Sequence, residues 1–197
     1  MTKSIDFYFD FISPYSYLAH QKIKILNKKN RININYKPML LGGLHNLGGI
    51  TAPAFNVRKL KNMKNDCELI ASKNNIKFQW NKNFPINTLD LMRGFISIKK
   101  NLREKYFDIC FDAYWKDNLD ISKNENLKKI LDKCEINKEE FLNNIKEQSI
   151  KDELKNLTNK AFEKDVFGAP TFVVNNKIFW GQDRLEYALD EYNFKLS

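Results

Sequence analysis

Cysteine is scarce in this chain, and no two cysteines have the spacing of a redox or zinc motif. Cys67, Cys110 and Cys134 are far apart, and there are only two histidines. A dithiol active site needs a Cys-x-x-Cys pair, and a structural zinc site needs several cysteines or histidines at short spacing. Disulfide exchange and metal binding are therefore not expected. We predict three buried free thiols in a reducing compartment and no metal site.

Long apolar runs are absent, and glycine and proline are few. No stretch approaches the roughly 20 apolar residues that a membrane helix needs, and no signal-peptide pattern precedes the first apolar segment. We therefore expect a protein of the cytoplasm with no membrane partner. With 7 Gly and 5 Pro in 197 residues, a long disordered linker is not expected. The hydrophobic content of 43%, including 15 Phe, is enough for the core of one domain.

Positive charge exceeds negative charge, with 33 Lys and Arg against 24 Asp and Glu and a net charge of +9. Such an excess can favour nucleic acids or anionic substrates. The lysines are scattered, however, and they form no cluster of the kind that marks a nucleic-acid surface. A codon bias toward A and T would enrich Lys, Asn and Ile together without any function. We therefore expect no nucleic-acid partner.

The start of the chain predicts a strand, a helix and a second strand. Residues 3–10 are an apolar, aromatic-rich run, residues 14–28 have helical spacing, and residues 32–36 alternate between apolar and polar. Ser13 and Pro14 supply an N-cap and a first-turn proline for the helix. Because a helix connects the two strands, we expect the strands to be parallel.

The middle of the chain is predicted to be a loop followed by helices. Residues 41–53 hold four of the seven glycines and are predicted to be a loop. Asn87, Thr88 and Ser122 are candidate helix caps. Apolar residues at three- and four-residue spacing predict helices over residues 57–74, 88–101, 103–116, 123–133 and 138–164.

The end of the chain returns to strands. Residues 171–174 and 177–180 alternate, and the Asn-Asn pair between them is typical of a hairpin turn. A last helix is predicted over residues 183–192. Asp183 and Glu186 have the spacing of a capping box at its start.

The order of these elements predicts an α/β fold. Without the helical block the order is β-α-β…β-β-α, which is the thioredoxin-like fold; the block is then a large all-helical insertion. Residues 1–45 and 165–197 would form the thioredoxin-like domain, and residues 46–164 the helical insertion subdomain.

The first helix begins where thioredoxin-like folds carry their reactive cysteines, and here the four residues 13–16 are SPYS. The first-turn N–H groups point at whatever lies above the strand end. Ser13 is explained as a helix cap; alternatively, its hydroxyl donates to a thiolate that a ligand supplies. That hydrogen bond is worth about 1.5–3 kcal/mol, and the helix dipole adds about 0.3–1 kcal/mol. A thiol pKa would fall by about 1–3 units.

Two further motifs belong at the same place in such a fold. A proline just before the third strand, here Pro170, is typically cis in thioredoxin-like proteins. It exposes the backbone of the preceding Ala169 to an extended peptide, although a proline that merely starts a strand is an equal alternative. At the start of the last helix, free N–H groups suit a carboxylate and Asp183 suits an ammonium group.

Three motifs carry a resemblance to a known family: residues 10–16 (DFISPYS), 167–171 (FGAPT) and 179–184 (FWGQDR). From end to end, the chain resembles the 2-hydroxychromene-2-carboxylate isomerase and kappa-class glutathione transferase family, a branch of the DsbA-like thioredoxin superfamily. The resemblance implies glutathione as the cofactor and a homodimer. It also implies a glutathione-dependent isomerase, which acts by reversible addition of the glutathione thiolate to an unsaturated aromatic 2-oxo acid and cis/trans rotation.

Three other functions stay open. A kappa-class glutathione transferase or peroxidase would share Ser13 and consume glutathione. A dithiol oxidoreductase is disfavoured by the serines at positions 13 and 16. A glutathione-binding module without turnover is the last alternative.

The resemblance also implies roles for individual residues. Ser13 would be the catalytic residue and would hydrogen-bond the glutathione sulfur. The Ala169 backbone, ahead of Pro170, would pair with the cysteinyl backbone. Gln182 and Asp183 would hold the γ-glutamyl end.

The loop after the second strand matches the family less well. Lys59 lies near the family's basic contact to glutathione. Where the family often has Gly-Asn, this chain has Gly49 followed by Ile50, so that contact is missing and Asn46 or Thr51 would replace it.

A small aromatic or unsaturated carboxylate is the expected second substrate. Trp80 and Asn87 are candidates for binding it, beside Asn46. Core packing is the alternative for Trp80, and helix capping for Asn87. His20 is predicted to lie on a helix surface and His45 in a loop.

Overall fold

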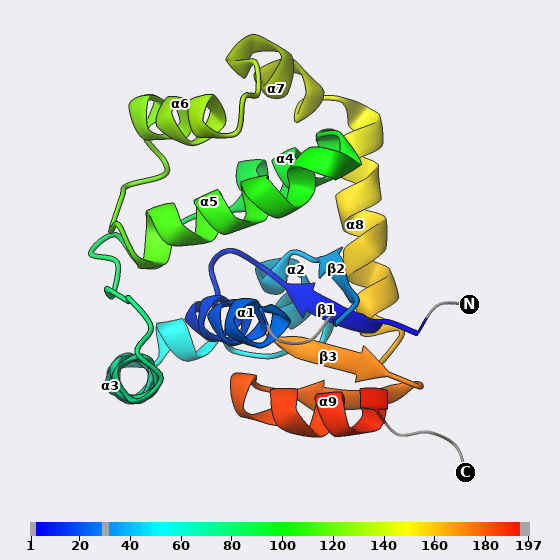
Figure 1. The fold of residues 1–197 in the computed structure, drawn as a ribbon. Helices are drawn as coiled ribbons and strands as arrows, with labels where there is room; N and C mark the ends of the chain where they lie inside the picture. Colours follow the sequence, from blue (N-terminus) through cyan, green and yellow to red (C-terminus); the bar gives the residue numbers. More distant parts are fainter. Residues whose placement is uncertain (1–2, 29–31, 194–197) are drawn as a thin grey trace.

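A four-stranded mixed sheet lies at the centre of the protein (Figure 1). The computed structural model describes residues 3–28 and 32–193. The strand order is β2-β1-β3-β4, with β1 parallel to β2 and β3 antiparallel to both β1 and β4. The strands are β1 (Ile5–Phe9), β2 (Ile34–Pro38), β3 (Thr171–Val174) and β4 (Lys177–Trp180). This is the thioredoxin-like arrangement with a helical insertion, so the predicted fold class is confirmed.

Helices surround the sheet, and most of them belong to the segment between β2 and β3 (Figure 1). In Figure 1, α4 to α7 lie above the sheet, α8 runs beside it and α9 lies below it. The helices are α1 (Pro14–Asn27), α2 (Leu41–Leu47), α3 (Val57–Lys73), α4 (Leu89–Ser97), α5 (Arg103–Trp115), α6 (Asn124–Lys133), α7 (Lys138–Asn144), α8 (Gln148–Phe162) and α9 (Leu185–Asn193). Three 3-10 turns are η1 (Pro53–Phe55), η2 (Lys100–Leu102) and η3 (Gln182–Arg184). The expected division into a thioredoxin-like domain and an insertion stays a prediction.

Aromatic side chains join the sheet to the inserted helices. Phe7 and Phe9 on β1 are fully buried. Phe107 on α5 meets Phe9 edge to face, with ring centroids 4.5 Å apart, an arrangement that aromatic pairs prefer. The insertion therefore shares one core with the sheet. Cys67, Cys110 and Cys134 are buried free thiols, as predicted.

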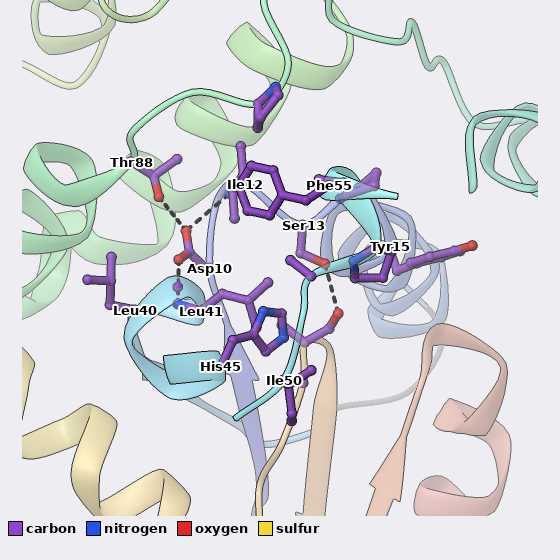
Figure 2. A pocket seen from close by; sticks show the side chains of 18 of the residues that line it. Asp10, Ile12, Ser13, Tyr15, Leu40, Leu41, His45, Ile50, Phe55 and Thr88 are labelled. Carbon is purple, nitrogen blue, oxygen red and sulfur yellow. Dashed lines mark hydrogen bonds between the residues drawn. The ribbon is translucent and has the colours of Figure 1, made fainter. Parts of the chain in front are cut away.

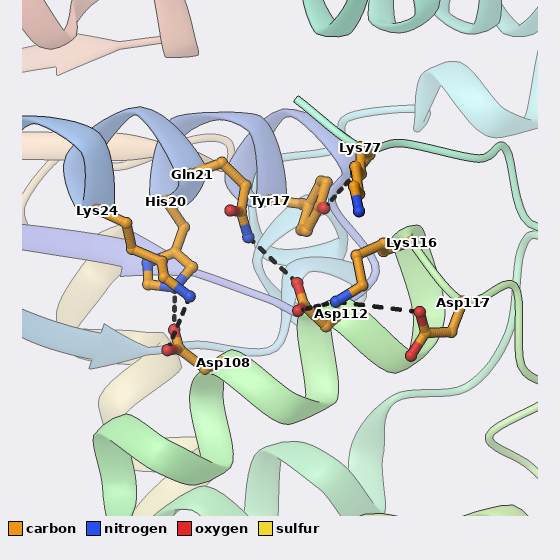
Figure 3. Close-up of polar contacts among 9 residues, drawn as sticks. All are labelled: Tyr17, His20, Gln21, Lys24, Lys77, Asp108, Asp112, Lys116 and Asp117. Atoms are coloured by element: carbon orange, nitrogen blue, oxygen red, sulfur yellow. Dashed lines mark hydrogen bonds and ion pairs between the residues drawn. The ribbon is translucent and has the colours of Figure 1, made fainter. Parts of the chain in front are cut away.

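Polar contacts also connect α1 to α5 (Figure 3). His20 is almost fully buried and its Nε2 bonds to the Asp108 carboxylate. Lys24 donates to the other oxygen of Asp108 at 2.9 Å, and Gln21 donates to Asp112 at 3.2 Å. The prediction that His20 lies on a helix surface was wrong. Its carboxylate partner is 88 residues away in the sequence, so local spacing could not reveal it.

Several predicted boundaries are confirmed. Ser13 caps α1 by accepting a hydrogen bond from the Ser16 N–H at 3.1 Å, and Pro14 occupies the first turn. The hairpin between β3 and β4 turns at Asn175 and Asn176, whose φ values of 49° and 61° are those of a type I′ turn. The second strand lies two residues later than predicted, because Ile32 bonds to the Asn27 side chain at 3.0 Å instead of entering the sheet.

The segment 41–53 is not a loop throughout, because α2 occupies its first half. The Asp10 carboxylate accepts a hydrogen bond from the Leu41 N–H at 2.8 Å at the start of this helix. A negative charge at a helix N-terminus is stabilising. Gly42 and Gly43 lie inside the helix, where glycine costs about 1 kcal/mol relative to alanine. Contacts from a distant part of the chain outweigh that cost.

The predicted helix over residues 138–164 is two helices, α7 and α8. Ile145 is the C-cap of α7, and Glu147 is extended, with φ −57° and ψ 135°. The predicted helix over residues 88–101 likewise ends at Ser97, because Ile98 is extended.

Two predicted caps were wrong. The N-cap of α6 is Lys123 rather than Ser122, whose hydroxyl bonds to Asp120. The predicted capping box of the last helix does not form. The chain enters a 3-10 turn capped by Gly181 without a side-chain hydrogen bond, and Asp183 pairs with Arg184 at 3.6 Å.

Over the described ranges, none of the helices combines the length and the apolar character needed to cross a membrane.

Candidate active site at the start of the first helix

A cavity of about 630 Å³ lies where β1 leads into α1. Because β3 is antiparallel to β1, the start of β3 lies at the same edge of the sheet as the end of β1. The segments 10–15, 40–55, 84–88 and 167–169 meet there and line the cavity. Its size is within the ordinary range of small-molecule sites. Six of the apolar lining side chains are Ile12, Ile50, Phe55, Met63, Phe84 and Trp180.

Ser13 lies at the cavity wall and is 3% exposed. Its hydroxyl donates to the Ala169 carbonyl at 2.9 Å (Figure 2). The same oxygen accepts from the Ser16 N–H. The N–H groups in the first turn of α1 have no intrahelical partner. The site therefore combines one hydroxyl proton with the positive end of a helix dipole, which suits an anion.

The Ala169–Pro170 peptide bond is cis, which is the first of the two alternatives left open for this proline. Ala169 lines the cavity, whereas the buried Pro170 lies outside its lining, and its carbonyl accepts from the Gly181 N–H at 2.9 Å. The carbonyl bonded to Ser13 therefore belongs to the half-exposed residue ahead of the cis bond. A peptide backbone that reached this edge would compete with Ser13 for that carbonyl.

Asp10 joins three of the segments that form the cavity (Figure 2). It is 1% exposed, and its carboxylate accepts from Thr88 Oγ1 at 2.6 Å, from the Leu41 N–H at 2.8 Å and from the Ile12 N–H at 3.1 Å. Burial raises the pKa of Asp10, and these hydrogen bonds oppose the rise. Asp10 belongs to the first motif of the sequence, but no role was predicted for it. Its position three residues before Ser13 was the available signal.

Trp180 forms a wall of the cavity that the sequence analysis also missed. Its indole packs over Gly168, where an added Cβ would lie 2.5 Å from Trp180 Nε1. The Phe167 and Trp180 rings are 4.9 Å apart. The glycine before Ala169 therefore leaves room for this indole. The antiparallel register of β3 and β4 places Trp180 opposite Thr171, at the start of β3.

His45 also lines the cavity, and it lies on α2 rather than in the predicted loop. It is 9% exposed. Burial lowers the pKa of its imidazole, so the ring is neutral at neutral pH. The sequence gave no signal that His45 lines the cavity, because the side-chain orientation of a residue in a predicted loop cannot be inferred.

Four other predicted residues lie at the cavity, and all four are exposed: Asn46, Thr51, Lys59 and Asn87. Lys59 is in the first turn of α3. Asp66, further along the same helix, accepts a hydrogen bond from Tyr15 of α1 at 2.8 Å. Asn46 lines the α2 side. Asn87 accepts from the Leu89 N–H at 2.9 Å, just before α4, whose N-cap residue is Thr88.

The remaining predicted residues lie outside the cavity lining. Gln182 is buried in the turn after β4 and accepts from Lys22 of α1 at 2.6 Å; Asp183, beside it, is exposed. Trp80 packs edge to face on Phe84, with ring centroids 4.9 Å apart. This placement favours core packing for Trp80.

The fold and the site together define a thioredoxin-fold protein in which a serine occupies the position of the nucleophilic cysteine. The family model described as the DSBA-like thioredoxin domain matches residues 4–193, and the chain belongs to that family.

Relatives with known names share the whole length of the chain. The 2-hydroxychromene-2-carboxylate isomerase of Sphingobium xenophagum is 28% identical over 194 residues, covering 98% of both chains. The glutathione S-transferase kappa 1 of Homo sapiens is 24% identical, covering 94% of this chain and 89% of the relative. A solved structure of 2-hydroxychromene-2-carboxylate isomerase superposes with a TM-score of 0.86 at 25% identity, covering 94% of this chain and 92% of that one. The resemblance seen in the sequence is confirmed, and the chain's relatives are isomerases and transferases.

Proposed function

We propose that this protein is a glutathione-dependent isomerase of unsaturated aromatic 2-oxo acids. The observation that carries the proposal is the position of Ser13, whose hydroxyl lies at the N-terminus of α1 beside the Ala169 carbonyl, in the wall of an apolar cavity. The full-length likeness to isomerases supports the same reaction class.

The residues around Ser13 fit glutathione. A thiolate suits a hydroxyl donor at a helix N-terminus. The half-exposed Ala169 backbone suits the peptide part of the ligand. Lys59 is an exposed cation at the cavity and suits a carboxylate. We therefore propose these three residues, together with Pro170 as the residue that fixes the Ala169 backbone, for holding glutathione.

Gln182 and Asp183 keep their proposed role at the γ-glutamyl end. They belong to η3, which packs beside α1 through the hydrogen bond from Lys22 to Gln182. With its oxygen occupied by Lys22, the Gln182 amide still has two N–H donors for a ligand carboxylate. A ligand at these residues would extend beyond the cavity along α1.

When bound, glutathione would supply a thiolate that adds reversibly to the conjugated double bond of the substrate, so that this bond can rotate. The Ser13 hydroxyl lowers the proton affinity of that thiol by donating to the sulfur. The apolar wall excludes water and suits an aryl group. Asn46 and Asn87 are proposed contacts for the second substrate at the cavity rim.

A kappa-class transferase or peroxidase is the second candidate, because relatives named glutathione S-transferase kappa 1 also match along the chain. Product analysis separates the two. The protein is incubated with glutathione and either the cis or the trans isomer of an arylidene pyruvate. The ratio of the two isomers and the amount of glutathione are then measured. An isomerase converts the geometric isomer and leaves glutathione unchanged, whereas a conjugate or glutathione disulfide would contradict the isomerase assignment.

The resemblance further implies a homodimer in the cytoplasm, which we include in the proposal. Sedimentation equilibrium tests the dimer, and a mass of one chain, 23.3 kDa, would contradict it.

A further inference from the structure

A lysine of the first helix fixes the orientation of the Gln182 amide. Lys22 Nζ donates to Gln182 Oε1 at 2.6 Å, and Gln182 is 8% exposed. A glutamine side chain without such a partner can turn either its oxygen or its NH₂ group toward a ligand. A lysine ammonium group has only donors, so the amide oxygen must face Lys22. The NH₂ group is therefore the part of the amide that a ligand can meet.

The NH₂ group of Gln182 is available to a ligand. Within residues 3–28 and 32–193, no group accepts a hydrogen bond from Gln182 Nε2. This nitrogen is not one of the buried atoms that lack a partner, so it is in contact with solvent. Its two N–H donors suit a carboxylate, whereas an ammonium group would need the oxygen that Lys22 already occupies.

Carboxylates of the last turn and helix lie near the same hydrogen bond. Burial lowers the pKa of Lys22, and the charges of Glu186 and Asp183 oppose this. Asp183 follows Gln182 directly in η3 and is exposed. A donor of hydrogen bonds and an exposed anion are therefore neighbours in the chain. This pair suits a group that carries a carboxylate and an ammonium on one carbon atom, as an amino acid does.

The turn that contains Gln182 is connected to the Ser13 site through the cis-proline segment. The Gly181 N–H donates to the Pro170 carbonyl at 2.9 Å, and Ser13 donates to the Ala169 carbonyl at 2.9 Å. Two consecutive peptide units thus contact the two sites. An extended tripeptide is about 10 Å long, and such a ligand with its sulfur at Ser13 and its backbone at Ala169 has Gln182 beyond them along the same path.

We propose that Lys22 is a positioning residue that makes Gln182 select a carboxylate at the γ-glutamyl end of glutathione. The inference rests on the proposed function, which supplies glutathione as the ligand. Because Lys22 holds the amide oxygen, Gln182 offers only N–H donors to the α-carboxylate, and Asp183 accepts from the α-ammonium group. A donor that is already aligned loses less orientational freedom on binding. Lys22 acts through Gln182 and does not touch the ligand itself.

Binding of glutathione and two matched analogues tests this role without turnover. The 4-aminobutanoyl analogue of the tripeptide lacks the α-carboxylate, and the glutaryl analogue lacks the α-ammonium group. Calorimetry compares wild type, Lys22→Met and Lys22→Arg. We expect Lys22→Met to weaken binding of glutathione and of the glutaryl analogue by roughly 3- to 10-fold. It should leave binding of the 4-aminobutanoyl analogue unchanged, which also shows that the variant is folded.

Two control variants accompany this comparison. Lys22→Arg keeps N–H donors for the amide oxygen and should bind glutathione nearly as wild type does. Lys28 is the exposed C-cap of α1. Lys28→Met removes the same charge from the same helix without affecting Gln182, and its affinity for glutathione should be unchanged.

A double-mutant cycle separates positioning from direct contact. Gln182→Met removes the amide and keeps a side chain of similar length. If Lys22 acts only through Gln182, then Lys22→Met has no further effect on glutathione affinity in the Gln182→Met background. A further loss in that background would mean that Lys22 binds the ligand itself, and this would overturn the positioning role.

The outcomes distinguish this inference from the proposed function. Equal affinity of wild type and Lys22→Met for glutathione, or an equal loss for all three ligands, overturns the role of Lys22. Failure of wild type to bind glutathione overturns the proposed function together with that role. Glutathione binding that depends on Lys22 in a protein that does not isomerise arylidene pyruvates supports the inference and overturns the proposed isomerase alone.

Discussion

Ser13 has a single hydroxyl proton, and the structure uses it for the Ala169 carbonyl. The same oxygen accepts from the Ser16 N–H, so the cap of α1 does not depend on where the proton points. When the hydroxyl donates to a thiolate, the Ala169 carbonyl becomes free for a peptide N–H of the ligand. A single rotation of the Ser13 hydroxyl would therefore allow one hydrogen bond to the sulfur of the ligand's cysteine and another between the Ala169 carbonyl and a peptide N–H of the ligand.

Asp10→Asn tests how the cavity is held together. Asn places an NH₂ group where one carboxylate oxygen accepts from Leu41 or from Ile12 and Thr88. A buried N–H would then face another N–H, so we expect the free energy of unfolding to fall by about 1–3 kcal/mol. Urea unfolding measures it. Thr88→Ser, which keeps the hydroxyl, is the control and should lose less; an unchanged Asp10→Asn would show that these bonds do not stabilise the fold.

Local signals determine some elements of this protein and not others. Ser13 with Pro14 identifies the start of α1, and the Asn pair identifies the hairpin, because each acts on its own backbone. The start of α2 could not be predicted, since its charge partner Asp10 lies 31 residues earlier. The break between α7 and α8 did have a signal: the five-residue step from Ile145 to Ile150 interrupts the three- and four-residue spacing.

The candidate site could also be predicted only in part, because some of its residues belong to local sequence motifs and others are placed by distant contacts. Ser13 and Ala169 belong to contiguous motifs, and the topology brings those motifs together. The position of His45 at the cavity depends on how the short, glycine-containing helix α2 is oriented, and no local sequence pattern predicted that helix. Trp80 is an aromatic side chain of the kind expected in a substrate wall, but it lies outside the cavity lining and packs against the cavity-lining Phe84 and the buried Trp115.

Two glycines in helices should respond to alanine with opposite sign. At Gly94 in α4, an added Cβ would lie 2.4 Å from the buried Phe141 ring and 2.6 Å from Tyr106 Oη. We expect overpacking to exceed the helix preference of alanine, so that Gly94→Ala lowers the free energy of unfolding by at least about 1 kcal/mol. At Gly42 in α2, no atom lies within 4 Å, so Gly42→Ala should raise it by about 0.5–1 kcal/mol. Urea unfolding of both variants checks the signs; stabilisation by Gly94→Ala would mean that α4 can move away from α7.

The α1–α5 contact links the thioredoxin-like part of the protein to its insertion, and we expect it to make the stability of the fold sensitive to acid. Burial lowers the pKa of His20 below its ordinary value of 6.5, although Asp108 opposes this. Burial also raises the pKa of Asp108, but the hydrogen bonds and charges of His20 and Lys24 outweigh it, and the net shift is downward. A neutral His20 that donates from Nε2 to a charged Asp108 agrees with both directions.

Stability should therefore fall as the pH drops below the ordinary pKa of histidine. The unfolded chain takes up a proton on His20 near pH 6.5, while the folded protein does not. Each such proton lowers the free energy of unfolding by up to about 1.4 kcal/mol per pH unit. The pKa of Asp108 is lowered in the folded protein, so the charged carboxylate also contributes to stability. That contribution is lost only in stronger acid, below the ordinary pKa of 3.8.

His20→Gln should flatten that dependence, because glutamine keeps a donor for Asp108 and does not titrate. Urea unfolding between about pH 7.5 and about pH 5.5 measures the slope in wild type and variant. His45→Gln gives the separate contribution of the second histidine, whose pKa burial also lowers. Equal slopes in wild type and His20→Gln would mean that His20 is already protonated in the folded protein.

Glutathione binding, followed by calorimetry and by the ultraviolet absorbance of the thiolate, tests the central claim that Ser13 holds an ionised thiol at the start of α1. Wild type is compared with Ser13→Ala and with Ser16→Ala, a control that removes a buried hydroxyl with no hydrogen-bond partner in the described parts of the chain. We predict that wild type and Ser16→Ala bind glutathione with a thiolate band at neutral pH. In Ser13→Ala the thiol pKa should rise by about 1–2 units and the band should be lost. Failure of wild type to bind glutathione, or a thiolate band that persists in Ser13→Ala, would contradict the account and leave Ser13 as a helix cap.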